Sequence, residues 1–344
     1  MAEVRALRWD GDALVLLDQT ALPAVEDYVA CRDVDAVVDS VRRLVVRGAP
    51  ALGAVGGYGV AVAMLQGHRE SWTSDRLEAE VDRIRDARPT AVNLAWGVDR
   101  VRPHMPGGVE SVLAEADRIV SEDTAANRQL SRHGADWILA RVSRRPLRVV
   151  THCNTGALAT TGWGTAFGII RELAERDQIE LVYADETRPL LQGARLTAWE
   201  CERNGIPYVV QSDGAAASTI LRGLADVAVI GADRIARNAD TANKIGSVGV
   251  ALACSAAGIP FVVAAPSSTV DLATESGDQI EIELRAGDEV TRWGSVETTP
   301  PGAQGFNPAF DVTPAQYISA VVTELGVIEP ARGETVETIV GAPA

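Results

Sequence analysis

From residue 147 onward, short apolar segments alternate with segments of helical pattern, and this alternation constrains the fold more than any other feature of the sequence. The apolar segments begin about 20 to 35 residues apart and read LRVVTH, IELVYAD, PYVVQSD, DVAVIGAD and PFVVAAP. Continuous apolar runs of this kind are typical of strands buried on both faces of a parallel sheet and joined by right-handed helical crossovers. The pattern predicts an α/β domain over residues 146–344 with a Rossmann-like, doubly wound parallel sheet.

Residues 1–145 differ in pattern and predict a smaller, mainly helical N-terminal domain that begins with a hairpin. ALRW and ALVLLDQ flank a turn-forming Asp-Gly-Asp sequence, as in a hairpin. Apolar residues then recur at helical spacing over 34–46 and over 109–141, and Pro50 suits the first turn of a helix between them. A chain of 344 residues has room for two domains of this size.

The composition limits the kinds of partner that the chain can bind. The net charge of −15 opposes nonspecific binding to nucleic acid or to an anionic membrane, so an anionic ligand must be met by a local cluster of Arg, Lys and backbone amides. The N-terminus lacks a signal-peptide pattern, and we expect no uncharged apolar run of 18 residues, the length of a membrane span. We therefore expect a cytoplasmic protein that binds neither nucleic acid nor membranes.

The four cysteines, at positions 31, 153, 201 and 254, are far apart in the sequence. They form no CxxC pair, and no His cluster has the spacing of metal ligands. The sequence therefore predicts neither a metal site nor a disulfide framework. Isolated thiols of this kind suit a reducing compartment.

The ligand crevice of an open parallel sheet lies outside the carboxyl ends of its strands, so the residues that follow each strand are the first site candidates. A thiol, acids and glycines follow the predicted strands. In chain order they are Cys153, Asp185 with Glu186, Asp213 with Gly214, Asp233 with Arg234, and Pro266 with Ser267. For Asp185 and Glu186 we favour a scaffolding ion pair with Arg188 over proton transfer.

Cys153 is the candidate nucleophile or base among these residues. An Asn-Thr-Gly sequence and then an expected helix follow it, so backbone amides and a helix N-terminus would stabilise a thiolate there. A lone cysteine is more often a small buried apolar residue, and that interpretation stays open. The cysteines that lack this setting are expected to be structural: Cys31, Cys201 and Cys254.

Asp233 is the candidate general acid. It ends the segment DVAVIGAD, which carries no other charge after its first residue. Partial desolvation at the sheet edge would raise the pKa of this carboxyl group and make it a usable acid near neutral pH. The alternative is an Asp that caps a turn or pairs with Arg234 or Arg237.

Several polar positions suit an anionic ligand without forming a nucleotide fingerprint. GALATTGWG matches neither G-x-G-x-x-G nor G-x-x-x-x-G-K-[ST], which argues against a nicotinamide dehydrogenase. RGAP places Arg47 and free amides at a helix start, and Arg88, Asn243 and Lys244 lie in further polar segments. Each of these residues also has an ordinary explanation as part of an interhelical link or as a solvated side chain.

The chain resembles the methylthioribose-1-phosphate isomerases in long motifs that cover nearly all of it and occur in the family's order. These motifs are LLDQTALP, VRGAPALG, ARPTAVNL, THCNTGALAT, ADETRPLLQGARLTAWE, GADRIARNADTANKIGS and FNPAFDVTP. The family shares one superfamily with regulatory subunits of the eukaryotic initiation nucleotide-exchange factor and with ribose-1,5-bisphosphate isomerases.

The resemblance implies an isomerase of methionine salvage that converts 5-methylthioribose 1-phosphate into 5-methylthioribulose 1-phosphate without a metal or nucleotide cofactor. The family's catalytic cysteine, in the HCNTG motif, falls on Cys153, and its catalytic acid, in the GADR motif, falls on Asp233. The family's substrate contacts fall on Arg47, Gly48, Ala49, Arg88, Gln192, Asn243 and Lys244.

Two alternatives stay open within this resemblance. An isomerase of 5-deoxyribose 1-phosphate or ribose 1,5-bisphosphate would need the same chemistry, and a noncatalytic sugar-phosphate-sensing subunit would share the fold. Family members commonly form homodimers, so a homodimer is expected. The tail from residue 329 is expected to be loosely ordered.

The implied chemistry gives each catalytic residue its own task. The substrate carries phosphate on its anomeric oxygen, so it has no free aldehyde and the enzyme must open the ring. We expect protonated Asp233 to give its proton to the ring oxygen while the Cys153 thiolate removes the C2 proton. A hydride shift from C2 to C1, with the same two residues in supporting roles, is the competing route.

Overall fold

The computed structural model describes residues 4–89 and 92–341, which form two compact units. Unit 1 comprises the described residues up to Ala126 together with Thr155–Gly164. Unit 2 comprises Asn127–Asn154 and the described residues from Thr165 onward. The long helix α5 (Val109–Arg141) passes from the first unit into the second, with the bounds that the sequence predicts.

Unit 1 begins with a three-stranded antiparallel sheet. Its strands β1 (Leu7–Asp10), β2 (Ala13–Leu17) and β3 (Tyr28–Cys31) lie in that order, and β2 is buried along its whole length. The predicted hairpin is confirmed, with Gly11 at φ 64° in its turn. The third strand is not predicted, because its sequence YVAC is short and follows acidic residues.

The helices of unit 1 follow the sheet. They are α1 (Val34–Arg42), α2 (Ala49–Arg69), α3 (Ser74–Arg85), α4 (Val92–Val101) and the first part of α5. Asp33 begins α1 by accepting the backbone N–H of Ala36 at 2.7 Å, as an N-cap residue does. The predicted end of this helix at residue 46 is wrong, because Leu44 has a φ of 64° and breaks the helix after Arg42.

Helix α2 corrects the expectation that the chain holds no uncharged run of membrane-spanning length. Its length and composition would allow it to cross a membrane, but 72% of its 18-residue apolar stretch is buried inside the structure. It crosses α4 at close range, since a Cβ atom on Gly97 would lie 1.9 Å from the carbonyl oxygen of Gly53. Core packing in unit 1 therefore accounts for its apolar character. Pro50 lies in its first turn, as predicted.

Unit 2 is built on a seven-stranded sheet in the order β16-β15-β10-β7-β4-β5-β6, which confirms the predicted doubly wound α/β class. All neighbouring strands are parallel except β15 and β16. From β6 to β15 the strands have the 3-2-1-4-5-6 order of the dinucleotide-binding folds, whose ligand crevice lies where the chain reverses direction, here between β4 and β7. The strands are β4 (Leu147–Thr151), β5 (Ile179–Asp185), β6 (Tyr208–Gln211), β7 (Val227–Ile230), β10 (Phe261–Ala264), β15 (Ala320–Thr323) and β16 (Gly326–Ile328).

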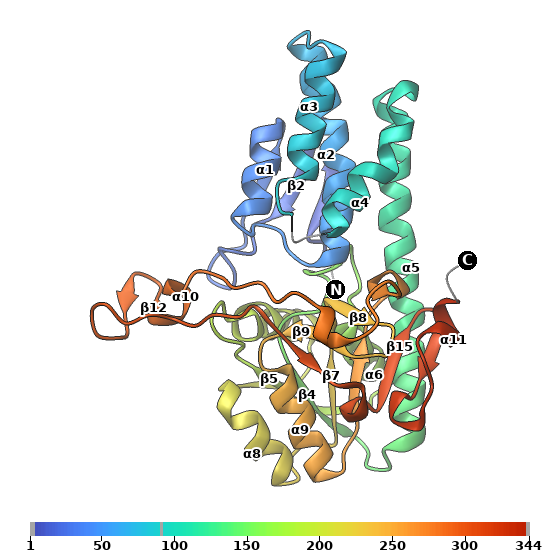
Figure 1. Ribbon diagram of the computed structural model, residues 1–344, viewed down its shortest axis with the longest axis vertical. Coiled ribbons are helices and arrows are strands. Elements are labelled where there is room, and N and C mark those ends of the chain that lie inside the picture. Colours follow the sequence, from blue (N-terminus) through green and yellow to red (C-terminus); the bar gives the residue numbers. More distant parts are fainter. Residues whose placement is uncertain (1–3, 90–91, 342–344) are drawn as a thin grey trace. The chain divides into compact units, whose positions relative to one another are not determined.

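Each face of this sheet has its own apolar core, which explains the continuous apolar strands. In β7, Val227 and Val229 face one core while Ala228 and Ile230 face the other. The end of α5 together with α6 (Ala166–Glu175) and α7 (Ala198–Asn204) covers the first face. On the second face α8 (Ala216–Leu221) and α9 (Ser247–Ala257) lie beside each other (Figure 1).

A smaller four-stranded sheet in unit 2 is not predicted by the sequence, which reads as polar loops there. Its order is β11-β8-β9-β14, and it carries the GADRIARNADTANK motif as a hairpin. The strands are β8 (Arg234–Ala236), β9 (Thr241–Lys244), β11 (Val270–Asp271) and β14 (Phe310–Thr313). Between β11 and β14 the chain forms α10 (Asp288–Thr291), β12 (Arg292–Trp293) and β13 (Val296–Glu297).

The prediction of a loosely ordered tail is wrong for the part that the structure describes, up to residue 341. The tail forms α11 (Glu337–Val340), and Val336 is fully buried in the core of the second face. Glu329 accepts a hydrogen bond from the Trp137 indole at 3.0 Å and pairs with Arg141. These contacts fix the tail to unit 2.

Candidate active site

Cys153 lies at the carboxyl end of β4 in a conformation that a cysteine rarely adopts. Its φ is 63°, its side chain is 8% exposed, and its backbone N–H donates to Thr187 Oγ1 at 2.8 Å. Its carbonyl oxygen accepts from Thr197 Oγ1 at 2.6 Å. A left-handed conformation costs a residue other than glycine about 1–3 kcal/mol and persists only where its surroundings impose it. Such strain is concentrated at functional sites.

The helix N-terminus that was expected close after Cys153 is not found there. The helix that follows, α6, begins at Ala166 and not directly after Gly156, so its N-terminus does not adjoin Cys153 in the chain. Instead, Asn154 donates its side-chain N–H to Glu200 Oε1 at 2.7 Å, and both residues are buried. The threonine hydroxyls and backbone around Cys153 define its position.

Thr187 completes this arrangement from the end of β5. It also has a φ of 63°, and its hydroxyl group donates to the carbonyl oxygen of Asp185 at 2.9 Å. The carboxylate of Asp213 accepts the backbone N–H groups of Thr187 and Arg188, both at 2.7 Å. Residues after three adjacent strands therefore hold the backbone of Cys153 in place.

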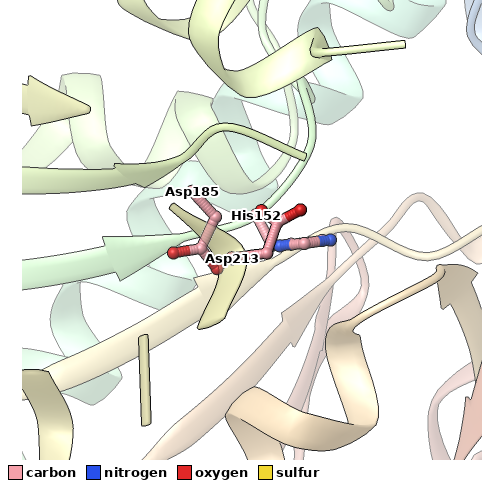
Figure 2. Close-up of side chains that lie close together, drawn as sticks. All are labelled: His152, Asp185 and Asp213. Atoms are coloured by element: carbon pink, nitrogen blue, oxygen red, sulfur yellow. Dashed lines mark hydrogen bonds and ion pairs between the residues drawn. The ribbon is translucent and has the colours of Figure 1, made fainter. Parts of the chain in front are cut away.

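His152, which directly precedes Cys153, forms a buried pair with Asp185. His152 Nδ1 lies 2.9 Å from Asp185 Oδ2, and each side chain is 1% exposed. Figure 2 shows both side chains together with Asp213. The other imidazole nitrogen, Nε2, donates to the Ile245 carbonyl oxygen at 2.8 Å, and Gln211 donates to Asp185 Oδ1 at 2.8 Å.

This pairing corrects the predicted ion pair between Asp185 and Arg188. The Arg188 guanidinium group instead donates to the carbonyl oxygens of Glu289 and Val290 at 3.4 and 3.1 Å. It also lies over the ring of Trp293, 5.2 Å from the ring centroid. Arg188 therefore holds the segment of α10 rather than the acid at the end of β5.

Burial lowers the pKa of His152, but the hydrogen bond and charge of Asp185, the charge of Asp213 and the Ile245 carbonyl outweigh it and hold the pKa above its ordinary value. Ligand atoms of His152, Asp185 and Asp213 lie within 4.8 Å of one another, a spacing that a metal ion could use. Each of these side chains is already hydrogen-bonded within the protein. Both imidazole nitrogens face oxygen acceptors, and both carboxylates accept hydrogen bonds from N–H groups. Internal hydrogen bonding accounts for the cluster.

The end of β9 carries two of the predicted substrate contacts. Asn243 is buried and donates to Ser247 Oγ at 2.8 Å. Lys244 is half-buried, donates to the Ala309 carbonyl oxygen at 2.8 Å and lies 4.7 Å from the centroid of the Phe310 ring. A Cβ atom on Gly246 would lie 2.8 Å from His152 Cε1, so only glycine fits beside the imidazole.

Gln192 lies just before a short π-helix, Gly193–Thr197. Its side chain is 5% exposed, and its Oε1 accepts no hydrogen bond from the residues that the structure describes. A buried amide oxygen in this state favours a ligand that donates to it. The neighbouring Gly193 lets this segment pack closely against the end of β5, since a Cβ atom on Gly193 would lie 1.7 Å from the Asp185 carbonyl oxygen.

Asp233 lies in the link between β7 and β8, where its backbone N–H donates to the Ala242 carbonyl oxygen at 2.9 Å. The residue is exposed, so the expected desolvation of its carboxyl group is absent from this structure. Arg234 pairs with Asp271 at 3.4 Å and Arg237 pairs with Glu275 at 2.7 Å.

The remaining predicted contacts belong to unit 1. Gly48 caps α2 with a φ of 95°, and a Cβ atom on it would lie 2.2 Å from the Ala159 carbonyl oxygen. Arg47, Ala49 and Arg88 are half-buried, and Arg88 follows α3. Thr90 and Ala91 of the same motif lie outside the described residues.

Sequence reasoning missed several residues that build the site: His152, Thr187, Thr197, Gln211 and Gly246. For His152 a signal was present, because it directly precedes the cysteine at the end of a predicted strand. No comparable sequence signal marks Thr187 and Thr197, since their role depends on which strands become neighbours.

Comparisons with known proteins place the chain in a family. Its residues 45–330 match the family model described as the Initiation factor 2 subunit family. A methylthioribose-1-phosphate isomerase of Heliobacterium modesticaldum is 47% identical, over 97% of this chain and 98% of that one. A probable bifunctional methylthioribose-1-phosphate isomerase/methylthioribulose-1-phosphate dehydratase of Nocardia farcinica is 50% identical over 94% of this chain, which spans 59% of that protein's length.

Two solved structures share the fold. The 5-methylthioribose 1-phosphate isomerase of Pyrococcus horikoshii has a TM-score of 0.86 and 33% identity, covering 96% of this chain and 94% of that one. The translation initiation factor eIF-2B subunit delta of A. fulgidus has a TM-score of 0.87 and 38% identity, covering 98% and 100%. With a family model that spans most of its length and relatives aligned from end to end, the chain belongs to the Initiation factor 2 subunit family.

Proposed function

We propose that this protein catalyses the conversion of 5-methylthioribose 1-phosphate into 5-methylthioribulose 1-phosphate, a step of methionine salvage. The observation that carries the proposal is the end-to-end relationship to a methylthioribose-1-phosphate isomerase at 47% identity. The strained, buried Cys153 supports it, because an apolar structural cysteine needs no such conformation. We also propose that the protein acts in the cytoplasm as a homodimer.

The substrate explains why an enzyme of this kind needs an acid and a base. Phosphate on the anomeric oxygen keeps the sugar in its ring, so the aldehyde through which ordinary aldoses isomerise is not available. In the proposed reaction, Cys153 as thiolate removes the C2 proton while the bond between C1 and the ring oxygen breaks. Asp233 gives its proton to that oxygen, and the electron pair of the C2–H bond becomes the C1=C2 double bond.

The resulting enol phosphate completes the isomerisation without an external reactant. The hydroxyl group on C2 loses its proton and becomes the ketone, and C1 receives a proton. Atoms and electrons balance, so no redox cofactor enters this reaction. A hydride shift from C2 to C1 gives the same product and is distinguished by isotope labelling at C2, because a proton removed by Cys153 can exchange with solvent.

The proposed substrate contacts are of three kinds: backbone amides, cations and side-chain amides. In the proposal, Gly48 and Ala49 offer amides at the start of α2, Arg47, Arg88 and Lys244 bind the phosphate, and Gln192 and Asn243 orient the sugar hydroxyl groups. Asp233 is exposed here, so the bound sugar must displace water from its carboxyl group before that group can act as an acid.

The test is a turnover assay of the purified protein with three sugar phosphates: 5-methylthioribose 1-phosphate, 5-deoxyribose 1-phosphate and ribose 1,5-bisphosphate. The proposal requires the first to have the highest kcat/KM. A preference for either of the others assigns the protein to the neighbouring isomerase activity, which uses the same chemistry and differs at C5.

A second candidate is a noncatalytic subunit of an initiation-factor complex, which the 38% identity to the A. fulgidus structure favours. This candidate predicts binding of a sugar phosphate without turnover. Calorimetric binding of 5-methylthioribose 1-phosphate, together with the absence of ketose product after long incubation at high enzyme concentration, would select it over the isomerase.

A further inference from the structure

His152 connects two parts of the candidate site that come from distant positions in the chain. Its main chain leads directly into Cys153 after β4, and its ring reaches the turn after β9, where Nε2 lies 2.8 Å from the Ile245 carbonyl oxygen. Nδ1 lies 2.9 Å from Asp185 Oδ2 at the end of β5. One buried side chain thus links three strand ends.

The ring also packs against the turn that its Nε2 binds. A Cβ atom on Gly246 would lie 2.9 Å from Nε2, so the turn already packs against the imidazole. Asp311 also holds this turn, since its Oδ2 accepts the backbone N–H of Gly246 at 2.8 Å. Lys244 directly precedes the Ile245 carbonyl group that His152 binds. Movement of the ring would therefore move the lysine.

We propose that His152 is a positioning residue that sets the Cys153 thiol and the Lys244 ammonium group relative to each other through its two ring hydrogen bonds. This inference rests on the proposed function, in which Cys153 acts on the sugar carbons and Lys244 binds the phosphate. Both groups act on one small substrate, so displacement of Cys153 impairs the chemical step and displacement of Lys244 weakens substrate binding even when each group is intact.

The two ring hydrogen bonds have separable effects. The bond to Asp185 holds the end of β4 beside β5 and acts on Cys153, which takes part in the chemical step. The bond to Ile245 holds the turn of Lys244 and acts on substrate binding. A positioning role therefore predicts a loss of kcat from the first change and a rise of KM from the second.

Two substitutions separate these effects, because an asparagine amide reaches the place of Nδ1 and a glutamine amide reaches the place of Nε2. His152→Gln keeps the bond to Ile245 and loses the bond to Asp185, so kcat should fall about 10-fold or more with KM within about threefold. His152→Asn keeps the bond to Asp185 and loses the bond to Ile245, so KM should rise about 10-fold or more with kcat within about threefold.

A conservative change at Asp185 tests whether geometry or charge is responsible. In Asp185→Asn the amide oxygen still accepts from Gln211, and the amide N–H donates to Nδ1 of a neutral imidazole. A positioning role predicts that Asp185→Asn keeps most of the wild-type kcat, unlike His152→Gln. If a His152 variant does not fold, Asp185→Ala removes the same hydrogen bond from the other side and should lower kcat in its place.

Asp226→Asn is the matched control. Asp226 accepts hydrogen bonds from the Arg148 side chain at the opposite end of β4, at 2.8 and 3.1 Å. Its loss should lower the melting temperature without changing kcat or KM. The positioning role is overturned if both His152 variants change kcat and KM by the same factors, or if Asp185→Asn loses as much kcat as His152→Gln.

Failure of the proposed function can be recognised separately. Wild-type turnover and its loss in Cys153→Ser decide that function before the His152 variants are compared. The alkylation rate of Cys153 by iodoacetamide tests the positioning role without any turnover. It should rise at least threefold in His152→Gln and stay within twofold in His152→Asn, and equal rates in both variants contradict the inference.

Discussion

Cys153 and Thr187 hold each other across the ends of two parallel strands, and both have a φ of 63°. The backbone N–H of Cys153 donates to the Thr187 hydroxyl oxygen at 2.8 Å, and that hydroxyl group donates in turn to the Asp185 carbonyl oxygen. A β-branched residue in the left-handed region is a true outlier, so the surrounding contacts must compensate for its strain. The thiol is thus presented by backbone geometry that only the assembled strand ends produce.

Cys153→Ser should lower kcat by about three orders of magnitude, because the hydroxyl group of serine is not a thiolate at neutral pH. The fold should be retained, since serine has nearly the same size. Steady-state kinetics and melting temperature check both statements. Cys254→Ser on α9 is the control and should keep full activity, and wild-type turnover in Cys153→Ser would remove this residue from the mechanism.

Asp233→Asn should also lower kcat by orders of magnitude, because an amide cannot donate the proton that opens the ring. Asp233 is exposed, so its replacement should shift the melting temperature by no more than about 1–2 °C. The measurement is kcat together with substrate affinity from calorimetry. A variant that retains more than about a tenth of wild-type kcat would show that another group supplies the proton.

Iodoacetamide at pH 8 should modify Cys153 before any other cysteine of the native protein. Cys31, Cys201 and Cys254 are fully buried, and burial raises the pKa of each thiol, to about 12 for Cys254. Cys153 is the cysteine with measurable exposure, at 8%. Mass spectrometry after partial reaction identifies the site, and unfolding in guanidinium chloride, where all four react, is the control. Early labelling at another cysteine contradicts the structure.

Gly193→Ala should destabilise the protein by about 3 kcal/mol, because the added methyl group would lie 1.7 Å from the Asp185 carbonyl oxygen, which belongs to the backbone and cannot move aside. Gly249→Ala is the matched comparison. Gly249 lies inside α9 with no atom near its missing methyl group, so this change should stabilise by about 0.5–1 kcal/mol. Urea unfolding measures both, and equal effects would contradict the packing at the end of β5.

Asp226→Asn should lower stability by about 2 kcal/mol at pH 7. Burial raises the pKa of Asp226, but hydrogen bonds and charge from Arg148 outweigh it, together with the charge of Arg144, and hold the pKa below its ordinary value. A depressed folded-state pKa stabilises the protein above the unfolded-state pKa of about 3.9, and this contribution is lost as the pH falls through the folded-state value.

The stability difference between wild type and Asp226→Asn should therefore be constant above about pH 5 and shrink at lower pH. Urea unfolding at a series of pH values measures it. A difference that grows on acidification would mean that Arg148 does not stabilise the charged carboxylate. Asp278→Asn is a suitable control at an exposed position.

The parallel strands β4, β5, β6, β7 and β10 could be predicted because each is an apolar run with a polar or turn-forming residue after it, but the parallel strand β15 was not predicted. The His152–Asp185 pair could not, since its partners are 33 residues apart and meet only because β4 and β5 become neighbours. The assignment of Asp185 to Arg188 failed for the same reason, as proximity in sequence was the only available guide. The β8–β9 hairpin was not predicted because β8 has only three residues and β9 is mostly polar.

The candidate residues show the same limit. The position of Cys153 after a buried strand was predictable, but its left-handed backbone depends on hydroxyl groups supplied by Thr187 and Thr197. The exposure of Asp233 was not predictable, because β7 ends at Ile230 and Asp233 lies in the link to a hairpin that the sequence did not predict.

The close crossing of α2 and α4 also determines how unit 1 acquires its structure. Glycines let the two backbones touch, but each glycine inside a helix opposes helix formation by about 1 kcal/mol relative to alanine. Residues 49–69 alone would therefore be mostly random coil in water. We therefore expect this helix to form only together with the segment that docks against it, so that secondary and tertiary structure in unit 1 depend on each other.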